Sequence, residues 1–344
     1  MKEALLYEPI GGNRVRCGLC AHRCVIKEDA TGFCGVRINR KGRLYSAVYE
    51  KVISASIDPI EKKPLFHFQP GSGSLSIATM GCNMKCDHCQ NFEISQPPAE
   101  AGEIRGRSVE PDQLVESAIE AGCTSISYTY TEPTVFFELA SETAEAASKR
   151  GLKNVFVTNG YMTRETLEAI DPHLHGANVD LKSFRDGFYK EQCGARLEPV
   201  LDTIRAMKQS GIWVEVTTLI IPDLNDSEAE LDDIASFIAE TGTEIPWHIS
   251  AFHHTYRMRG HRSTPVGTLH RAREIGLRKG LRYVYCGNVP GEVGENTVCY
   301  QCGETLIERY GFRVVRNRIE GDACPACDSE IDGVALSSAN TFRG

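Results

Sequence analysis

The sequence predicts an α/β fold: a partial (β/α)6 barrel with a small cysteine-rich unit on either side of it in the chain. Strand-like and helix-like runs alternate from about residue 75 to residue 286, as they do around a parallel sheet with right-handed crossovers. The 344 residues, 41% of them hydrophobic, suffice for one large barrel with appendages. Most of the 14 cysteines gather in three clusters, and two of these clusters lie outside the alternating region.

The composition limits the binding partners and the cellular compartment that we expect for the protein. The formal net charge of −8 argues against non-specific binding to nucleic acid, which needs a basic surface. No window approaches the ~18 consecutive apolar residues of a membrane span, and residues 1–9 show no signal-peptide pattern. Clustered cysteines without an export signal indicate metal binding in a reducing compartment. We therefore expect a cytoplasmic protein that binds neither nucleic acid nor membranes.

The first unit, residues 1–57, has four cysteines in the spacing C-x2-C-x3-C-x9-C. This loop-rich segment has too little apolar sequence to fold alone, so a bound metal would supply the missing stability. Four thiolates suit both zinc and an auxiliary iron–sulfur cluster, and the spacing leaves both open. Strands are expected between Leu44 and Ile57. The four expected ligands are Cys17, Cys20, Cys24 and Cys34.

The central unit, residues 58–290, begins with a charged connector and a flexible turn at Gly71 to Ser74. Six strand–helix pairs follow, with apolar residues at the spacing of each element. Pro111 is expected in the first turn of one helix, and Asp226 is expected to cap another. Strands are expected at residues 75–78, 124–130, 155–157, 177–181, 213–221 and 247–252, with an extra strand at 282–286. Helices are expected at residues 111–121, 133–149, 163–170, 198–209, 226–240 and 266–279.

The stretch from Met80 to Asn91 follows the first of these strands and holds Cys82, Cys86 and Cys89 in the order C-x3-C-x2-C. Three thiolates can ligate three irons of a [4Fe-4S] cluster and leave the fourth iron open to bind and reduce a small molecule. The alternative is a zinc site with His88 as the fourth ligand. Because His88 adjoins Cys89, the two residues are awkward to place on one tetrahedral ion. The cluster is therefore the preferred interpretation.

Polar residues follow the later strands, at the edge where the active sites of such barrels form. Each has an ordinary explanation as well. Glu132 could simply begin a helix, Asp180 and Lys182 could form a structural ion pair, and His253 could be a core histidine. Their joint placement over one cysteine loop favours a functional interpretation. The segments are 129–133, 158–160, 180–182 and 253–254.

The cysteine loop resembles the signature of the radical S-adenosylmethionine (SAM) superfamily. In that superfamily the open iron chelates the amino and carboxylate groups of SAM, and the reduced cluster cleaves SAM to methionine and a 5'-deoxyadenosyl radical. The resemblance implies that His88 lies near the adenine, where the superfamily usually has an aromatic residue. It also implies that the backbone near His88, Gln90 and Thr131 helps to orient SAM.

From Leu75 to Cys286 the chain also resembles the glycyl-radical-enzyme activases of the pyruvate formate-lyase type. Their Gly-Gly-Glu motif after the second strand corresponds to Tyr130-Thr131-Glu132, which keeps the glutamate without the glycines. Their Asp-Thr-Asn-Gly corresponds to residues 157–160, without the aspartate of a monovalent-cation site. Their Asp-Leu-Lys is intact at residues 180–182, and their histidine after the sixth strand is present. The SAM contacts implied by this resemblance are Thr131, Glu132, Asp180, Lys182 and His253.

Over nearly its full length the chain resembles the radical SAM enzymes of the AmmeMemoRadiSam system. This resemblance implies partners similar to the Memo and AMMECR proteins. Reductive cleavage of SAM further implies an electron donor such as a flavodoxin or a ferredoxin. The residues that carry the resemblance are 17–34, 58–63, 81–91, 128–134 and 287–291.

The last unit, residues 291–344, contains two C-x2-C motifs at nearly the spacing of a zinc ribbon. We expect a metal there, with zinc preferred over a rubredoxin-like iron. The four expected ligands are Cys299, Cys302, Cys324 and Cys327. The three remaining cysteines, Cys123, Cys193 and Cys286, are expected to be inert.

Together these features predict an anaerobic radical SAM enzyme whose radical abstracts hydrogen from a protein or peptide substrate, as an activase does. One alternative keeps the chemistry and makes the substrate a small molecule. Another is a zinc-stabilised adaptor with a degenerate barrel. An activase-like barrel needs an open mouth for a macromolecule. The two cysteine units lie on either side of the barrel in the sequence, so we expect both to flank that mouth. The alternative is that they merely tie down the ends of the chain.

Overall fold

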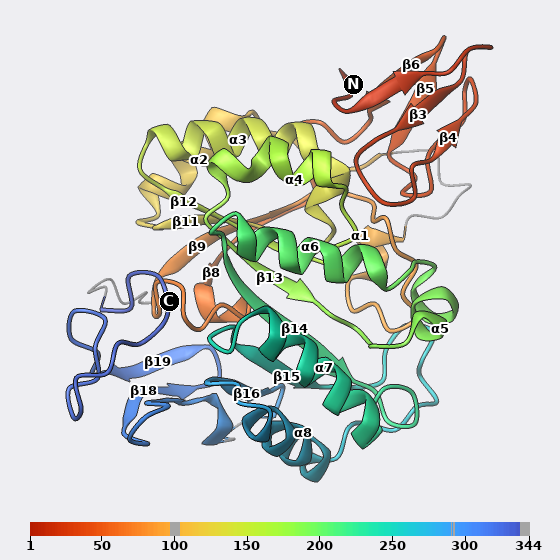
Figure 1. Ribbon diagram of the computed structural model, residues 1–344. Helices are drawn as coiled ribbons and strands as arrows, with labels where there is room; N and C mark the ends of the chain where they lie inside the picture. Colours follow the sequence, from red (N-terminus) through yellow and green to blue (C-terminus); the bar gives the residue numbers. More distant parts are fainter. Residues whose placement is uncertain (97–103, 290, 292, 338–344) are drawn as a thin grey trace.

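The computed structural model describes residues 1–96, 104–289, 291 and 293–337 of the chain. At its centre is an eight-stranded sheet in the order β16-β15-β14-β13-β12-β11-β9-β8 (Figure 1). All neighbouring strands are parallel except β8 and β9, which are antiparallel. The paired strands end at β8 and β16, so they form an open sheet, and closure into a partial barrel stays a prediction. The strands are β8 (Ser54–Pro59), β9 (Gly73–Ala78), β11 (Ser125–Tyr128), β12 (Lys153–Thr158), β13 (Gly176–Asp180), β14 (Trp213–Ile220), β15 (Trp247–Ala251) and β16 (Val284–Gly287).

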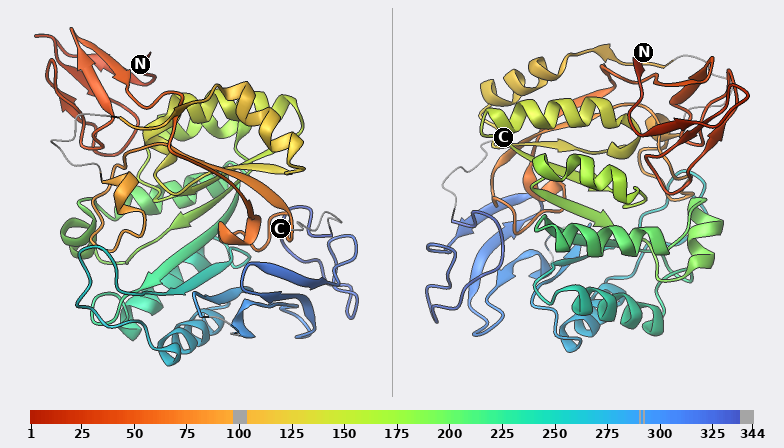
Figure 2. Two further views of the ribbon diagram at one scale, coloured as in Figure 1. Left: turned by 180° about the vertical axis from the view of Figure 1, so that it is seen from behind. Right: turned by 45° about the horizontal axis from the view of Figure 1, so that its top comes forward.

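A long helix follows each of the first six parallel strands, so the six predicted strand–helix pairs are present. These helices lie on one side of the sheet, and the view from behind shows the strands of the other side (Figure 2). The helices are α2 (Pro111–Glu120), α3 (Phe137–Lys149), α4 (Arg164–Ile170), α6 (Glu198–Gln209), α7 (Glu228–Thr241) and α8 (Val266–Arg278). Shorter helical segments are η1 (Ile60–Lys62), α1 (Phe92–Ser95), η2 (Pro133–Phe136), η3 (Asp171–His173), α5 (Asp186–Phe188), η4 (Tyr189–Cys193) and η5 (Val293–Glu295).

Two local predictions are wrong. The N-cap of α7 is Ser227, whose side chain accepts a hydrogen bond from Glu230 N, whereas Asp226 instead accepts one from Asp223 N in the preceding turn. The glycine-rich stretch before β9 is only partly a turn, because β9 already begins at Gly73. In both places polar or glycine-rich sequence is compatible with more than one local structure.

The side of the sheet away from the helices is lined by polar groups. The chain between β8 and β9 lies against this side, where Asn178 Nδ2 donates to Pro64 O at 2.7 Å. The carboxylate of Glu215 accepts hydrogen bonds from Phe66 N at 3.0 Å and His67 N at 2.8 Å. Ile60, Leu65 and Phe68 of the same connection form an apolar cluster with Val155 of β12, so polar contacts and apolar packing together cover this side of the sheet.

The N-terminal unit, residues 1–53, contains two three-stranded sheets, β1-β6-β5 and β2-β3-β4. It lies at the carboxyl edge of the central sheet, where Cys20 forms a β-bridge with Met162 in the loop after β12. A Cβ added to Gly81, which has φ +98°, would lie 2.6 Å from Val36 Cγ1, so only glycine permits this approach. The strands are β1 (Lys2–Glu3), β2 (Tyr7–Pro9), β3 (Val15–Cys17), β4 (Val25–Ile26), β5 (Arg37–Arg40), β6 (Arg43–Ser46) and β7 (Lys51–Val52), which pairs with β10 (Arg107–Ser108).

A buried ion pair fastens this unit to α3. The guanidinium of Arg37 donates to both carboxylate oxygens of Glu138, at 3.0 and 2.9 Å, and the two side chains are only 2% and 1% exposed. Glu138 also accepts a hydrogen bond from Leu5 N at 2.7 Å. The two parallel hydrogen bonds fix the geometry of the pair. Separating the pair would leave a buried charge without its partner, so the pair holds the unit against α3.

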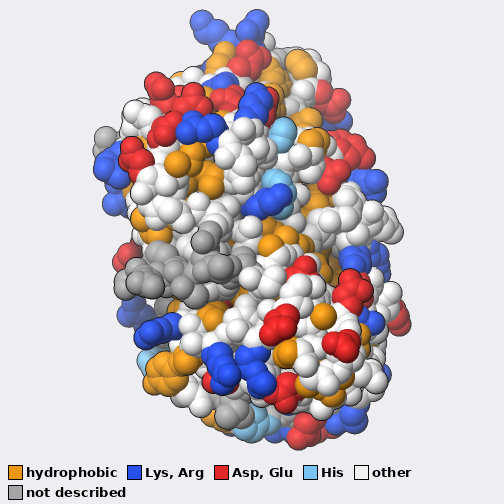
Figure 3. Space-filling model, turned by 90° about the vertical axis from the view of Figure 1, so that its left-hand side faces the viewer, with side chains coloured by type: hydrophobic (Ala, Val, Ile, Leu, Met, Phe, Trp, Pro, Cys, Tyr) orange, Lys and Arg blue, Asp and Glu red, His pale blue; other side chains and the backbone are white. Residues whose placement is uncertain are grey.

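The C-terminal unit packs at the other end of the central sheet, around the amino ends of its strands. Tyr283, just before β16, and Phe66 share an apolar cluster with Leu306. Arg309 is buried and donates to Phe66 O at 2.8 Å. On the side of the molecule shown in Figure 3, Lys and Arg side chains are interspersed with Asp and Glu. The strands are β17 (Thr297–Val298), β18 (Thr305–Tyr310) and β19 (Arg313–Asn317), in one sheet.

Only the N-terminal unit lies at the edge where the predicted mouth is, so the prediction that both units flank it is wrong for the C-terminal unit. The chain leaves the carboxyl end of β16 and doubles back, so that Thr297 Oγ1 lies 2.8 Å from Tyr285 Oη. The predicted boundary after Ile57 falls inside β8, which pairs with β9 over its whole length. The other predicted boundary residue, Pro290, lies outside the described residues. None of the described helices is long and apolar enough to cross a membrane.

The Arg37–Glu138 pair yields the first prediction. Glu138→Gln leaves the Arg37 charge buried without a counter-charge, and we expect a loss of about 3–5 kcal/mol in the free energy of unfolding. Glu145→Gln on the same helix removes only the exposed partner of Lys149 and should leave stability nearly unchanged. Anaerobic urea unfolding of both variants checks this. Equal stability of the two variants would show that the buried pair contributes little.

Candidate functional site

The loop after β9 places its three cysteines at the carboxyl edge of the sheet. The sulfur of Cys82 accepts a hydrogen bond from Met84 N at 3.4 Å and lies 3.7 Å from Asn159 Nδ2. The sulfur of Cys89 lies 3.1 Å from Ser95 Oγ. N–H and O–H groups around sulfur stabilise thiolates and tune metal clusters bound to them. The cysteines are thus presented as ligands at the end of the sheet where the sequence predicts the site.

Two other parts of the chain fasten this cysteine loop through its backbone. At the end of η4, Cys193 O accepts a hydrogen bond from Lys85 N at 2.8 Å, and Gln192 O accepts one from Asp87 N at 3.0 Å. On the opposite side, His22 Nε2 of the N-terminal unit lies 2.8 Å from Asn83 O. Backbone groups that would otherwise be unpaired are satisfied in this way, and the loop is fixed relative to the sheet.

Glu132 ties together the two strand-end loops beneath the cysteines. It is 2% exposed, and its carboxylate accepts four hydrogen bonds: from Thr134 N at 3.1 Å, Thr134 Oγ1 at 2.7 Å, Thr158 Oγ1 at 2.8 Å and Asn159 N at 2.8 Å. Burial raises the pKa of Glu132, and these hydrogen bonds oppose that rise. The hydrogen-bonding capacity of this carboxylate is therefore mostly used within the protein. Through these bonds Glu132 positions the residues around it.

Tyr130 has the backbone conformation that glycine favours. Its φ is +62°, at the place where the activase motif has a glycine, and a non-glycine residue there costs roughly 1 kcal/mol. Its hydroxyl donates to Asp58, and the ammonium of Lys63 lies 4.8 Å from the centre of its ring. These contacts offset the cost, so the turn keeps its shape without a glycine. Burial raises the pKa of Asp58, but hydrogen bonds from Lys62, Lys63 and Tyr130 outweigh it and lower the pKa.

Asp180 and Lys182 form an ion pair at the end of β13, with Lys182 Nζ 2.9 Å from Asp180 Oδ2. The carboxylate is 38% exposed and the lysine 13% exposed, so Asp180 faces the open edge of the sheet. Burial alone would lower the pKa of Lys182, but Asp180 and the thiols of Cys86 and Cys193 raise it well above its usual value. The pair therefore presents a charged carboxylate beside the cysteine loop.

The other predicted contacts also lie at this edge. Thr131 is buried, and its hydroxyl donates to Thr79 O at 2.8 Å, which joins the turn after β11 to the start of the cysteine loop. His253 is exposed, and its Nε2 lies 3.2 Å from Asn288 O beyond β16. Gln90 is exposed on the cysteine loop. The sheet thus brings to one edge the residues that the sequence places on five separate segments.

The structure also assembles a group that the sequence does not predict. One ligand atom from each of Cys86, His88 and Cys193 lies within 4.8 Å of the other two, and all three residues are buried. Burial, followed by the charge of Lys182, lowers the pKa of His88 to about 3, and its Nδ1 is without a hydrogen-bond partner in the described part of the chain. Cys193 is separated from Cys86 by more than one hundred residues, so no spacing motif reveals this contact.

The alternative zinc site on the cysteine loop is not assembled. Cys82 and Cys89 do not belong to the group around His88, and the three loop sulfurs do not gather within 4.8 Å of one another in the described structure. A single tetrahedral ion needs its sulfurs much closer, about 3.8 Å apart for a Zn–S bond of about 2.3 Å. A cluster that binds each thiolate through a different iron accepts the wider arrangement.

The C-terminal cysteines have the opposite geometry. Cys299 Sγ lies 3.7 Å from Cys327 Sγ, and Cys302 Sγ lies 3.7 Å from Cys324 Sγ, with all four sulfurs within 4.8 Å of one another. These separations match a tetrahedron of sulfurs around one ion, for which about 3.8 Å is expected. The four residues therefore fit a single metal ion, as predicted.

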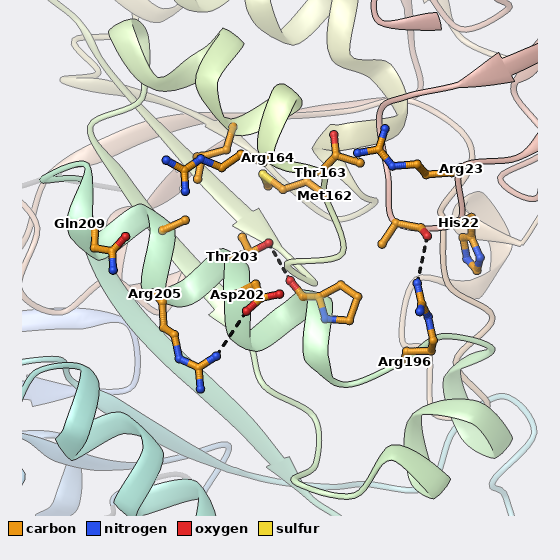
Figure 4. Close-up of a pocket in the computed structure, with 14 residues that line it drawn as sticks. His22, Arg23, Met162, Thr163, Arg164, Arg196, Asp202, Thr203, Arg205 and Gln209 are labelled. Carbon is orange, nitrogen blue, oxygen red and sulfur yellow. Dashed lines mark hydrogen bonds and ion pairs between the residues drawn. The ribbon is translucent and has the colours of Figure 1, made fainter. Parts of the chain in front are cut away.

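A recess of about 850 Å³ lies away from these residues. It is bounded by α4, α6 and residues 21–23 of the N-terminal unit (Figure 4). Arginines line it, but Arg23 is paired with Glu165, Arg164 with Glu168 and Arg205 with Asp202. The recess contains none of the predicted SAM contacts, so its size alone does not mark the active site.

Known proteins that are similar in sequence identify the family of this chain. Residues 76–238 match the model of the radical SAM superfamily. This chain belongs to that superfamily. An uncharacterised protein of Methanocaldococcus jannaschii is 48% identical over 335 residues, which cover 96% of this chain and 99% of the relative. The isethionate sulfite-lyase activating enzyme of Nitratidesulfovibrio vulgaris is 30% identical over 148 residues, 41% of this chain and 47% of that enzyme.

Two solved structures share the fold. SuiB of Streptococcus suis, bound to SAM, superimposes with a TM-score of 0.51 at 16% identity, covering 67% of this chain and 53% of SuiB. A radical SAM methyltransferase from Sphaerobacter thermophilus also gives 0.51, at 15% identity, covering 69% of this chain and 71% of the methyltransferase. Membership of the superfamily implies SAM and an iron–sulfur cluster as cofactors, and the cysteine loop after β9 has the ligands for such a cluster.

The sulfur tetrahedron yields the second prediction. Cys299→Ser should remove one metal ion per chain and lower the melting temperature, because a metal site of this kind stabilises a unit with a small core. We expect X-ray absorption of the unaltered protein to show four sulfur neighbours at about 2.3 Å around zinc. Cys123→Ser, which changes a buried thiol outside the clusters, is the control. Unchanged metal content in Cys299→Ser would contradict the assignment.

Proposed function

We propose that this radical SAM protein is an enzyme that uses a [4Fe-4S] cluster, held by Cys82, Cys86 and Cys89, to cleave SAM and start hydrogen abstraction from a protein or peptide. When bound, the cluster supplies the electron that cleaves SAM to methionine and a 5'-deoxyadenosyl radical. The observation that carries the proposal is the meeting of the three-cysteine loop with the polar ends of β11, β12 and β13 at one edge of the sheet.

The residues of the chain have separable tasks in this proposal. Asp180, partly exposed and paired with Lys182, is placed to bind a cationic or hydrogen-bond-donating group of SAM. His253 offers a ring nitrogen from the end of β15. His88 presents a neutral ring beside the cysteine loop, which suits contact with the adenine. Glu132 acts through the loops that it joins, and the backbone near Thr131 would bind the amino group of SAM.

An activase-like substrate is favoured by the relatives. The isethionate sulfite-lyase activating enzyme shares 30% identity over 148 residues, and a putative glycyl-radical enzyme activating enzyme of M. jannaschii shares 24% over 187 residues. A glycyl-radical activase abstracts hydrogen from a polypeptide backbone, so its substrate must enter the site as an extended segment. A small-molecule substrate is the alternative, but the polar groups behind β13 and β14 do not favour it, because they are bonded to one another and to the chain between β8 and β9.

The partners in this proposal follow from the chemistry and the resemblance. Each cleavage of SAM consumes one electron, which a flavodoxin or ferredoxin would deliver in the cytoplasm. Proteins similar to Memo and AMMECR are proposed as further partners of an AmmeMemoRadiSam-type enzyme. The adaptor alternative is disfavoured, because an adaptor has no need of the three-cysteine loop or of the buried carboxylate that positions the loops beside it.

The third prediction tests the cluster. Cys86→Ala should abolish formation of 5'-deoxyadenosine under reducing, anaerobic conditions, because two thiolates cannot hold a cluster with one open iron. Liquid chromatography with mass spectrometry measures the product, and metal analysis should show the C-terminal metal unchanged. Continued production of 5'-deoxyadenosine by this variant would refute the assignment of the cysteine loop.

The fourth prediction tests the SAM contacts. Asp180→Ala and His253→Ala should each weaken SAM binding by roughly tenfold, the effect of losing a hydrogen bond to a charged group, while iron content stays constant. His254→Ala is the matched control, because His254 is exposed next to His253. Anaerobic titration followed by electron paramagnetic resonance reports SAM binding at the cluster. Unaltered affinity in both variants would remove these two residues from the site.

A further inference from the structure

The four cysteines of the N-terminal unit differ in geometry from those of the C-terminal unit. Their sequence spacing leaves zinc and an iron–sulfur cluster equally open. The structure supplies a comparison within one molecule, because both units present four thiols of the same chain. We propose that Cys17, Cys20, Cys24 and Cys34 hold a polynuclear iron–sulfur cluster, next to the cysteine loop of the central sheet, whereas the C-terminal cysteines hold one ion.

The separation of the sulfur atoms is the first argument. The C-terminal sulfurs approach one another to 3.7 Å, as four ligands of one ion must. In the described structure, by contrast, no three of the N-terminal sulfurs lie within 4.8 Å of one another. The loop sulfurs of Cys82, Cys86 and Cys89, which belong to the superfamily signature, are spread in the same way. Wide separation is expected when each thiolate binds a different iron.

The space between the sulfurs is the second argument. All four N-terminal cysteines line one small void of about 20 Å³, together with the apolar side chains of Leu19, Ile26 and Val135. Protein interiors rarely leave a void, because each unfilled space forfeits contacts. Sulfurs around a single ion touch one another and enclose no such space. A space ringed by four thiols is the place that a thiolate-bound metal group would occupy.

The surroundings of the sulfurs are the third argument. Phe33 N donates a hydrogen bond to Cys24 Sγ at 3.5 Å. Cys82 receives the same kind of bond from Met84 N. The buried guanidinium of Arg37 also lines the void. N–H groups and a buried cation stabilise the negative charge of a thiolate-ligated cluster.

The location connects this site to the central sheet. Cys34 O would lie 3.1 Å from a Cβ on Gly81, the residue before Cys82. Thr134, which donates to Glu132, lines the void. The two cysteine sets thus lie in segments that pack directly against each other. A role in passing single electrons between them rests on the proposed function, but the presence of a cluster does not.

The decisive measurement is the metal content of anaerobically reconstituted full-length protein. In the triple variant Cys82→Ala/Cys86→Ala/Cys89→Ala, we expect about two or four iron atoms per chain with an equal amount of acid-labile sulfide, depending on whether the remaining cluster is [2Fe-2S] or [4Fe-4S]. Mössbauer spectra of ⁵⁷Fe should show coupled irons. Adding Cys17→Ser and Cys34→Ser should remove this iron and sulfide. Cys123→Ser should leave both unchanged.

Two results would overturn the proposal. One is a triple variant with no labile sulfide and a second zinc or single iron per chain. The other is unaltered protein with no more than about four irons, the content of the signature cluster alone. The second result needs no variant, so misfolding of the variants does not obscure the answer. Failure of SAM cleavage would count against the proposed function and leave this metal assignment untouched.

Discussion

A single buried carboxylate, Glu132, holds together the edge of the sheet on which the site depends. Its four hydrogen bonds connect the turn after β11 to the loop after β12, and both loops touch the cysteine loop after β9. A charge buried in this way is tolerated only because hydrogen-bond donors surround it. The strands place the loops near one another, but this carboxylate fixes their relative positions. The relative positions of the loops after β11 and β12 therefore rest on a residue that is itself almost fully enclosed.

The cysteine loop is held from two further sides by backbone contacts rather than by side-chain packing alone. The N-terminal unit reaches it through His22 and the close approach of Val36 to Gly81. Residues 192 and 193 reach it from the connection after β13. The loop that presents the cluster ligands is thus built into the protein on three sides, which suits a site that must bind its metals in one geometry.

Much of this was predictable from the sequence, because periodicity reports which elements form. The helix Glu198–Gln209 has its predicted bounds, and Cys82, Cys86 and Cys89 lie at the predicted end of the first parallel strand. The contact of Cys193 with Cys86 was not predictable, because a local pattern cannot report which distant loops meet. The prediction of where the C-terminal unit lies was wrong for a related reason. Its place depends on how residues after β16 double back, which the shared cluster of Phe66 and Tyr283 decides.

The unusual backbone of Tyr130 bears on how this chain can change over evolution. A glycine at that position needs no support, whereas the tyrosine relies on Asp58 and Lys63, which lie on a different segment. Replacing either supporting residue would expose the backbone cost, and a glycine at position 130 would remove the need for both. These three positions should therefore vary together among relatives of this chain. Covariation of this kind would trace one route by which a glycine turn can be replaced without reshaping the site.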